Sequence, residues 1–341
     1  MVIMPWNFPF WLPFKACIPP IVIGNSIMMK HSPSTPLCSL AIEEAFKEAG
    51  FGKGEYQNIF VNEGQCRQIL VDRRVRSVKF TGSTEAGSKV AMLAAQACKK
   101  GCFELGGDDP FVVLKDADMQ RAVDAAYASR MGNSGQACIN AKRFIITSPV
   151  YDEFKERLLE KIKSTTVIGD PLDPKTNLGP LALSRQKTKL YEQINKAITV
   201  GDGHLLYGDM NYMIPEKSLE QGNYVTPFVI EDINPNSSIY GEEFFGPVFN
   251  LYRVDSSKEA IDLANRSDYG LASTVFTEDL EKAEYAAMRL RTGTVFVNDC
   301  VTSGSEYPGG GIKGSGFGRE CYKDGLLDIA NRKTIIRRKQ Q

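Results

Sequence analysis

The sequence predicts an α/β fold with mostly parallel sheets. Segments with the periodicity of helices alternate with short apolar segments typical of buried strands along almost the whole chain. A chain of 341 residues can also bury more than one core, so we expect about two domains. Forty-one basic residues balance forty-one acidic ones, which gives no reason to expect nucleic acid or a membrane as a partner. The expected partners are small molecules and copies of the chain itself.

The apolar first thirty residues are not expected to form a signal peptide or a membrane anchor. No basic region precedes them, and their prolines are expected to break any helix. These prolines are Pro5, Pro9, Pro13, Pro19 and Pro20. The next element is a helix that starts at Thr35-Pro36 and ends at Gly50. Its expected apolar face consists of Leu37, Leu40, Ala41, Ala45 and Phe46.

Residues 75–80 are predicted to form a strand that leads through a turn into a helix at 88–99. With Gly82 and Ser83 in the turn, this arrangement has the form of a phosphate site, because free amides at a helix N-terminus attract anions. The glycine spacing, Gly82 to Gly87, differs from that of the common dinucleotide fingerprint. By itself the motif is weak evidence, because a glycine turn between a strand and a helix is common in α/β proteins and is the favoured alternative.

The remaining elements continue the alternation. Strands are expected at 111–114, 143–147, 224–230, 272–276 and 293–297, and helices at about 118–131, 151–163, 184–198, 257–265 and 279–290. Residues 201–223 lack periodicity and predict a surface loop. The glycine-rich segment 307–320 predicts a second loop, which a short helix and a final strand over 333–337 are expected to follow.

Two segments carry candidate catalytic residues. Cys138 ends the run Gly-Gln-Ala-Cys, and Glu104 opens the run Glu-Leu-Gly-Gly. A thiol that attacks a carbonyl and a carboxylate that activates water can oxidise an aldehyde through a thioester. The polar, glycine-containing approach at 132–135 predicts amide donors near the sulfur, which favour the thiolate over a free thiol with pKa about 8.5. The alternative is a buried structural thiol.

The histidines and the other cysteines exclude two further classes of site. A cysteine-histidine hydrolase needs an imidazole base, but His31 and His204 are the only histidines and neither lies near a supporting motif. The eight cysteines show no zinc spacing, so no metal is expected. Read as reduced thiols, they predict a cytoplasmic protein, with a mitochondrial location as the alternative.

Seven motifs in order resemble those of the aldehyde dehydrogenase superfamily. They lie at residues 4–9, 30, 80–87, 104–107, 135–138, 242–248 and 315–320, and the resemblance extends from residue 4 to about 336. It implies a Rossmann-like cofactor domain over 1–106, incomplete at the N-terminus, and a catalytic α/β domain over 107–308. It also implies a loop and helix over 309–330 that return to the cofactor domain, and an oligomerisation strand and tail over 331–341. The chemistry would then take place in the cleft between the domains.

The resemblance also implies a role for each matching residue. Cys138 would be the nucleophile and Glu104 would activate the hydrolytic water, while the side-chain amide of Asn7 and the Cys138 amide would form the oxyanion site. The implied cofactor-binding residues are Pro5, Trp6, Lys30, Ser32, Gly82, Ser83, Glu243 and Phe245. Among them, Lys30 would bind the adenosine ribose and Glu243 the nicotinamide ribose. The alternatives are a solvated Lys30 and a Glu243 that only ends a helix.

The expected cofactor is NADP or NAD. Many NAD-specific members have a glutamate three residues after the ribose lysine, but this chain has Pro33 there. Without that carboxylate a 2′-phosphate is not repelled, and Lys30, Ser32 and His31 are available to contact it. We therefore predict that NADP is accepted.

Other sequence features resemble the succinate-semialdehyde dehydrogenase branch, namely Asp108-Asp109, Lys142-Arg143 and the Pro308–Gly311 run. An anionic semialdehyde requires a cationic or hydroxyl-rich pocket. The candidate substrate-binding residues are Arg130, Lys142, Ser303 and Ser305. A CoA-acylating relative is the alternative enzyme, although Glu104 favours water as the acyl acceptor.

Members of the superfamily usually carry roughly a hundred further residues, about a domain's worth, before the segment that contains Asn7. In the resemblance, that segment pairs with the strand at 333–337, which would otherwise present an unpaired edge. We therefore expect a homo-oligomer if the segment is supplied. The alternatives are a fragment of a normal enzyme and an impaired structural or interaction form.

Overall fold

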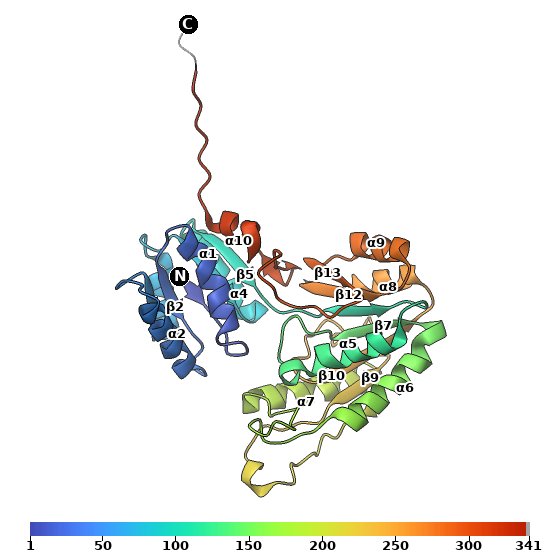
Figure 1. Cartoon of the computed structure of the whole chain (residues 1–341). Coiled ribbons are helices and arrows are strands. Elements are labelled where there is room, and N and C mark those ends of the chain that lie inside the picture. The colour runs from blue at the N-terminus through green and yellow to red at the C-terminus, as the bar shows by residue number, and fades with distance from the viewer. Residues whose placement is uncertain (339–341) are drawn as a thin grey trace. The chain divides into compact units, whose positions relative to one another are not determined.

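The computed structural model describes residues 1–338, and the chain in it divides into two units of α/β architecture (Figure 1). The first unit comprises Met1–Glu104, Gly304–Gly310 and the segment from Phe317 onward. The second unit comprises Leu105–Ser303 and Gly311–Gly316. The predicted fold class is confirmed, and the chain enters the second unit two residues before the expected boundary at 106. Residues 339–341, the end of the expected tail, lie outside the described residues.

A six-stranded sheet forms the centre of the first unit, in the order β15-β5-β4-β1-β2-β3. The strands are β1 (Val2–Ile3), β2 (Ile27–Lys30), β3 (Tyr56–Asn58), β4 (Ser77–Thr81), β5 (Lys100–Glu104) and β15 (Gly316–Phe317). The pairs β1–β2, β1–β4, β2–β3 and β4–β5 are all parallel. The carboxyl ends of these strands therefore lie along one edge, where ligands bind in open α/β sheets.

The helices of this unit are α1 (Trp11–Val22), α2 (Pro36–Glu48), α3 (Glu63–Val71), α4 (Thr84–Gln96) and α10 (Tyr322–Ile329). The expectation that prolines prevent a helix in the first thirty residues is wrong. Pro13 lies in the first turn of α1, where its missing amide hydrogen has no partner to lose. Pro19 and Pro20 lie in the last turns and are buried, so the helix tolerates them and ends at Val22.

The helix predicted from Thr35-Pro36 is confirmed as α2, but its predicted apolar face is only partly right. Phe46 is buried as expected, whereas Leu37 and Leu40 are 77% and 46% exposed, and Ile42, which was not in the predicted face, is buried. Phe46 stacks on Tyr56 of β3 with a ring separation of 4.2 Å, so the position of this aromatic pair sets the rotation of the helix. The sequence pattern allowed either face.

The second unit has a seven-stranded sheet in the order β13-β12-β6-β7-β10-β9-β8. These strands are β6 (Pro110–Val113), β7 (Arg143–Thr147), β8 (His204–Tyr207), β9 (Phe228–Glu231), β10 (Val248–Val254), β12 (Ala272–Phe276) and β13 (Thr294–Val297). Every pair is parallel except β8–β9. A short antiparallel pair, β11 (Tyr269–Gly270) with β14 (Ile312–Lys313), lies outside this sheet.

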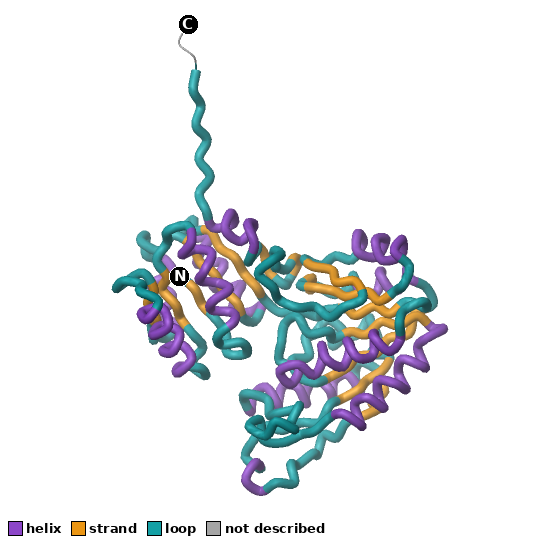
Figure 2. The backbone as a smooth tube through the Cα atoms, viewed as in Figure 1, coloured by secondary structure: helices purple, strands orange, loops and turns teal. Residues whose placement is uncertain are grey.

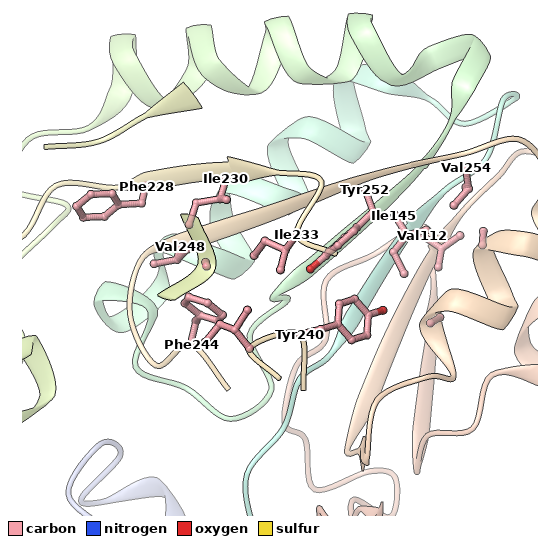
Figure 3. Close-up of a cluster of buried hydrophobic side chains, with 14 of the residues drawn as sticks. Val112, Ile145, Phe228, Ile230, Ile233, Tyr240, Phe244, Val248, Tyr252 and Val254 are labelled. Carbon is pink, nitrogen blue, oxygen red and sulfur yellow. The ribbon is translucent and has the colours of Figure 1, made fainter. Parts of the chain in front are cut away.

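Helices cover both faces of this sheet (Figure 1). They are α5 (Met119–Met131), α6 (Ser148–Thr165), α7 (Ser184–Thr199), α8 (Ser257–Ala264) and α9 (Leu280–Arg289), with short 3-10 turns η1 (Gly132–Gly135) and η2 (Lys217–Leu219). Alternate residues of β6 enter different cores: Phe111 and Val113 pack with α5 and α6, while Val112 packs with α7, α8 and α9. Figure 3 shows Val112 and Ile145 beside Tyr240 and Tyr252 in the latter core.

Three predictions about the second half of the chain differ from the structure. The loop expected at 201–223 contains β8, which pairs with β9 through a bulge. The strand expected at 224–230 begins only at Phe228. The strand expected at 333–337 is absent within the described residues, where Ile335 and Ile336 are 74% and 80% exposed; Figure 2 shows this segment as loop after α10.

Candidate active site

Cys138 lies in an unusual backbone segment between α5 and β7. In the preceding turn η1, Asn133, Ser134 and Gly135 all have positive φ values, of 52°, 55° and 73°. A Cβ atom on Gly135 would overlap the backbone of Gly246, so this contact requires glycine. The Cys138 side chain is half-buried. The loop thus places a reachable thiol on a tightly packed backbone.

Arg130, at the end of α5, holds this loop through hydrogen bonds to backbone carbonyl oxygens. Its guanidinium donates to the carbonyl oxygens of Ala141 (3.0 Å), Gly135 (2.8 Å) and Phe244 (2.9 Å), and also to that of Gly246. Burial lowers the pKa of Arg130 to about 9, which leaves the side chain charged at neutral pH. Arg130 therefore connects the loop that precedes Cys138 to the segment that contains Phe245.

Lys142 follows the nucleophile Cys138 in the sequence and is completely buried. Its ammonium donates to the carbonyl oxygens of Ala137 (3.2 Å) and Cys138 (2.6 Å). It also lies 3.4 Å from Oε1 of Glu243, which accepts a 3.1 Å hydrogen bond from the Gly107 amide. Glu243 and Phe245 are half-buried, so the Glu243 carboxylate is held in place yet remains accessible.

Two further buried carboxylates stand next to Lys142. Asp108 pairs with Arg143 at 2.7 Å and accepts from the hydroxyl of Ser267. Burial raises the pKa of Asp109 to about 7, although the Lys142 ammonium and the Ala272 amide oppose that shift. The cluster thus contains one buried carboxylate whose ionisation depends on the charge of Lys142.

The topology explains why these residues meet. Gly107, Cys138 and Glu243 precede β6, β7 and β10, which are adjacent parallel strands, so all three residues lie at the amino edge of the same sheet. The backbones at Gly107 and Cys138 lie close together, since a Cβ on Gly107 would be 2.6 Å from the Cys138 carbonyl oxygen. The sequence analysis did not assign Asp109 to this site. Its position directly before the buried strand β6 is the feature of the sequence that could have indicated it.

In the first unit the predicted residues follow the carboxyl ends of neighbouring strands. Asn7 comes after β1, Lys30 ends β2, and Gly82 and Ser83 join β4 to α4. The Ser83 hydroxyl caps α4 by accepting from the Ala86 amide at 3.3 Å. Glu104 ends β5, where its side chain is 6% exposed. Its carbonyl oxygen accepts from the Gly82 amide at 3.0 Å, so the turn and Glu104 are held together.

A pocket of about 340 Å³ opens at this edge. Lys30, Phe80 and Ser83 line it together with Arg67 and Lys89, two cations that the sequence analysis did not select. Lys89 is paired with Glu85 at 2.6 Å, which leaves Lys30 and the exposed Arg67 as the cations best placed for an anionic ligand. A larger residue in place of Gly82 would displace the Phe80 ring, because a Cβ there would lie 2.7 Å from it. These residues fit a nucleotide cofactor.

His31 does not add a positive charge to this pocket. Its side chain is 5% exposed, and its Nδ1 lies 3.3 Å from the Thr35 hydroxyl. Burial, with the nearby Lys30 ammonium, lowers the pKa of His31, which leaves the imidazole neutral at pH 7. Ser32 lies at the same turn and accepts from the Ser34 amide, while Pro5 and Trp6 are half-buried after β1.

The four candidate substrate residues fall into two groups. Arg130 and Lys142 have no exposed surface and bind backbone carbonyl oxygens, so neither belongs to the substrate site proposed below. Ser303 is half-buried and Ser305 is exposed, in the loop that follows β13. Within residues 1–338, no group of His, Cys, Asp and Glu side chains is arranged to hold a metal ion. No helix in that range has both the length and the apolarity to span a membrane.

Comparison with known proteins identifies this arrangement. Residues 1–335 match the aldehyde dehydrogenase family. The chain belongs to that family. The succinate-semialdehyde dehydrogenase [NADP(+)] of Deinococcus radiodurans is 41% identical over 98% of this chain and 68% of its own length. The succinate semialdehyde dehydrogenase [NAD(P)+] of Escherichia coli is 38% identical over 98% of this chain and 71% of its own.

Solved structures of similar proteins lead to the same family. A crystal structure of succinic semialdehyde dehydrogenase from Streptococcus pyogenes, in complex with NADP+ as the cofactor, superposes with a TM-score of 0.92 at 38% identity. The alignment covers 97% of this chain and 71% of that protein. The resemblance to aldehyde dehydrogenases, and among them to the succinate-semialdehyde branch, is confirmed, as is the prediction that the chain is an enzyme of this family.

Proposed function

We propose that this aldehyde dehydrogenase oxidises succinate semialdehyde, or a similar anionic semialdehyde, to the carboxylate with NADP or NAD. The observation that carries the proposal is the half-buried Cys138 on a backbone fixed by Arg130 and Lys142, where the Lys142 ammonium contacts both the Cys138 carbonyl oxygen and the Glu243 carboxylate. The relatives named above, which share 38–41% of their aligned residues with this chain, support the substrate. Ser303 and Ser305 remain the proposed substrate contacts.

The chemistry assigns each residue one task. The Cys138 thiolate adds to the aldehyde carbon, and the resulting oxyanion is stabilised by the Asn7 side-chain amide and the Cys138 amide. A bound nicotinamide cofactor supplies the acceptor for the hydride that leaves this carbon, which yields a thioester. Glu104 takes a proton from water, the water attacks the thioester, and the carboxylate product leaves as the thiol is restored. Lys30, Gly82, Ser83, Glu243 and Phe245 would hold the cofactor, with Pro5, Trp6 and Ser32 beside them.

The substrate assignment predicts a preference for a negatively charged aldehyde. We expect kcat/KM for succinate semialdehyde to exceed that for pentanal, an uncharged aldehyde of similar length, by at least about tenfold, or 1.4 kcal/mol of transition-state binding. Steady-state kinetics with purified protein measure the ratio, and chromatography of the products distinguishes free succinate from an acyl-CoA formed in the presence of CoA. Equal kcat/KM values for the two aldehydes would contradict the substrate but leave the reaction type standing.

The cofactor pocket predicts that NADP is used at least as well as NAD. Introducing a carboxylate by Pro33→Glu is expected to lower kcat/KM for NADP about tenfold and to spare NAD, because a negative charge three residues after Lys30 would repel a 2′-phosphate bound at that lysine. The matched control is Ser34→Glu, which places the same charge on the neighbouring exposed residue. A wild-type protein that strongly prefers NAD, or a P33E variant with unchanged cofactor ratio, would refute this reading.

The oligomer and the location are also proposals. We propose a homo-oligomer in which residues 333–337 gain a strand partner, since Ile335 and Ile336 are otherwise exposed. All eight cysteines are free thiols, which supports a reducing compartment such as the cytoplasm.

A further inference from the structure

We propose that Lys142 is a positioning residue that couples the nucleophile to the carboxylate expected to hold the cofactor ribose. The Lys142 ammonium is the shared neighbour of the Ala137 and Cys138 carbonyl oxygens and of Glu243 Oε1. The proposal rests on the proposed function for the role of Glu243. Its chemical content, a link between Cys138 and Glu243, is independent of that role.

Burial makes the link strong. Lys142 is fully buried and its ammonium is surrounded by oxygen atoms, so its charge cannot be screened by water as a surface charge is. Glu243 is 18% exposed on its side chain, and its second anchor is the Gly107 amide. If the ammonium is removed, Glu243 loses its cationic partner and two buried carbonyl oxygens lose a donor.

Because Lys142 contacts both Cys138 and Glu243, we expect it to affect both the cofactor site and the nucleophile. Toward the cofactor, it fixes the rotamer of Glu243, which otherwise would be held only by one amide. Toward the nucleophile, it fixes the carbonyl group of Cys138 and so places a positive charge on the residue that carries the thiol; we expect this charge to raise the reactivity of the thiol. Two chemically different readouts therefore report on the same side chain.

The chain offers a matched control in the neighbouring residue. Glu242 pairs with Lys196 at 2.6 Å, and Lys196 makes no contact with the Cys138 segment in the described structure. Each of the single substitutions Glu242→Gln and Lys196→Met thus removes a lysine–glutamate pair whose carboxylate is the residue next to Glu243. Both variants are expected to behave like the wild type.

The first measurement is the rate of Cys138 alkylation by iodoacetamide without cofactor. We expect Lys142→Met to lower this rate at least threefold, because the nearby positive charge is lost. Glu243→Gln should raise the rate at least threefold, because the ammonium charge is no longer neutralised. In the Lys142→Met background, Glu243→Gln should have no effect. If its effect persists there, Glu243 acts on the thiol directly and Lys142 is not the link.

The second measurement is NADPH binding, followed by its fluorescence. Lys142→Met is expected to raise the Kd about tenfold and to raise the cofactor KM more than it lowers kcat, and the double variant should bind no more weakly than Glu243→Gln alone. If the Kd of the double variant rises by the product of the factors for Lys142→Met and Glu243→Gln alone, the two residues act independently and the proposal is overturned. Lys142→Gln, whose amide still donates to the carbonyl oxygens, should recover soluble protein but not cofactor affinity.

The outcomes separate this inference from the proposed function. If the wild type neither binds NADPH nor oxidises aldehydes, the proposed function fails, while the alkylation rates still test the link between Lys142, Glu243 and Cys138. If the Lys142 variants are insoluble, the inference is tested by comparing the Cys138 alkylation rates of Glu243→Gln and Glu242→Gln. Equal alkylation rates in these two variants would overturn the inference.

Discussion

Replacing Cys138 by serine will lower aldehyde oxidation by a factor on the order of 10³ or more. A serine hydroxyl is a far weaker nucleophile than a thiolate at neutral pH, and neither histidine lies in the segment that surrounds Cys138 to activate it. The substitution leaves the Arg130 and Lys142 hydrogen bonds to the loop in place, because both go to backbone carbonyl oxygens. We therefore expect the thermal midpoint to stay within about 2 °C of the wild type.

Cys38 provides the matched control, because its thiol is likewise half-buried and lies on α2 in the first unit. Cys38→Ser should keep full activity in a coupled NADPH-formation assay. Alkylation of the wild type should abolish activity as one equivalent reacts, and mass spectrometry should place that equivalent on Cys138. Substantial activity in Cys138→Ser would show that another group carries the acyl intermediate.

Replacing Arg130 by methionine will destabilise the second unit by about 4 kcal/mol, because four buried carbonyl oxygens lose their donor at about 1 kcal/mol each. For a unit of this size, the corresponding fall in the thermal midpoint is roughly 10 °C. Activity should fall as well, since the loop before Cys138 and the segment around Phe245 are no longer joined. Differential scanning calorimetry and steady-state kinetics measure the two effects.

Arg121 lies on the same helix but is exposed, so Arg121→Met is the matched control and should shift the midpoint by no more than about 1 °C. Arg130→Lys retains a charge and three donors in place of the planar fork, and should fall between methionine and the wild type. A midpoint for Arg130→Met close to that of the control would mean that the carbonyl groups find other donors.

The sequence was most informative where a motif and a strand coincide. The α/β class, the helix at Pro36–Glu48 and the strand-to-helix turn after β4 follow from local chemistry: a proline at a helix start, a serine cap, a glycine where a ring packs. These features depend on residues a few positions apart. The resemblance of seven ordered motifs then supplied the family.

What the sequence could not supply was the direction in which side chains point. Arg130 and Lys142 were selected because an anionic substrate attracts cations, but both charges turn inward to backbone carbonyl oxygens. Leu37, Leu40 and Phe46 fit one apolar face, yet the stacking of Phe46 on Tyr56 buries Phe46 together with Ile42 and leaves the two leucines exposed. In each case a contact between distant segments decided the outcome, and local pattern contains no information about it.

The position of β15 beside β5 has a consequence for how the protein is made. As the chain leaves the ribosome, β5 (Lys100–Glu104) emerges with its outer edge unpaired, and its partner Gly316–Phe317 is translated only after nearly all of the second unit. At typical synthesis rates that interval is roughly 10 to 40 s. During it, the newly made strand that ends in Glu104 presents free backbone groups, so we expect nascent chains halted within the second unit to depend on a chaperone.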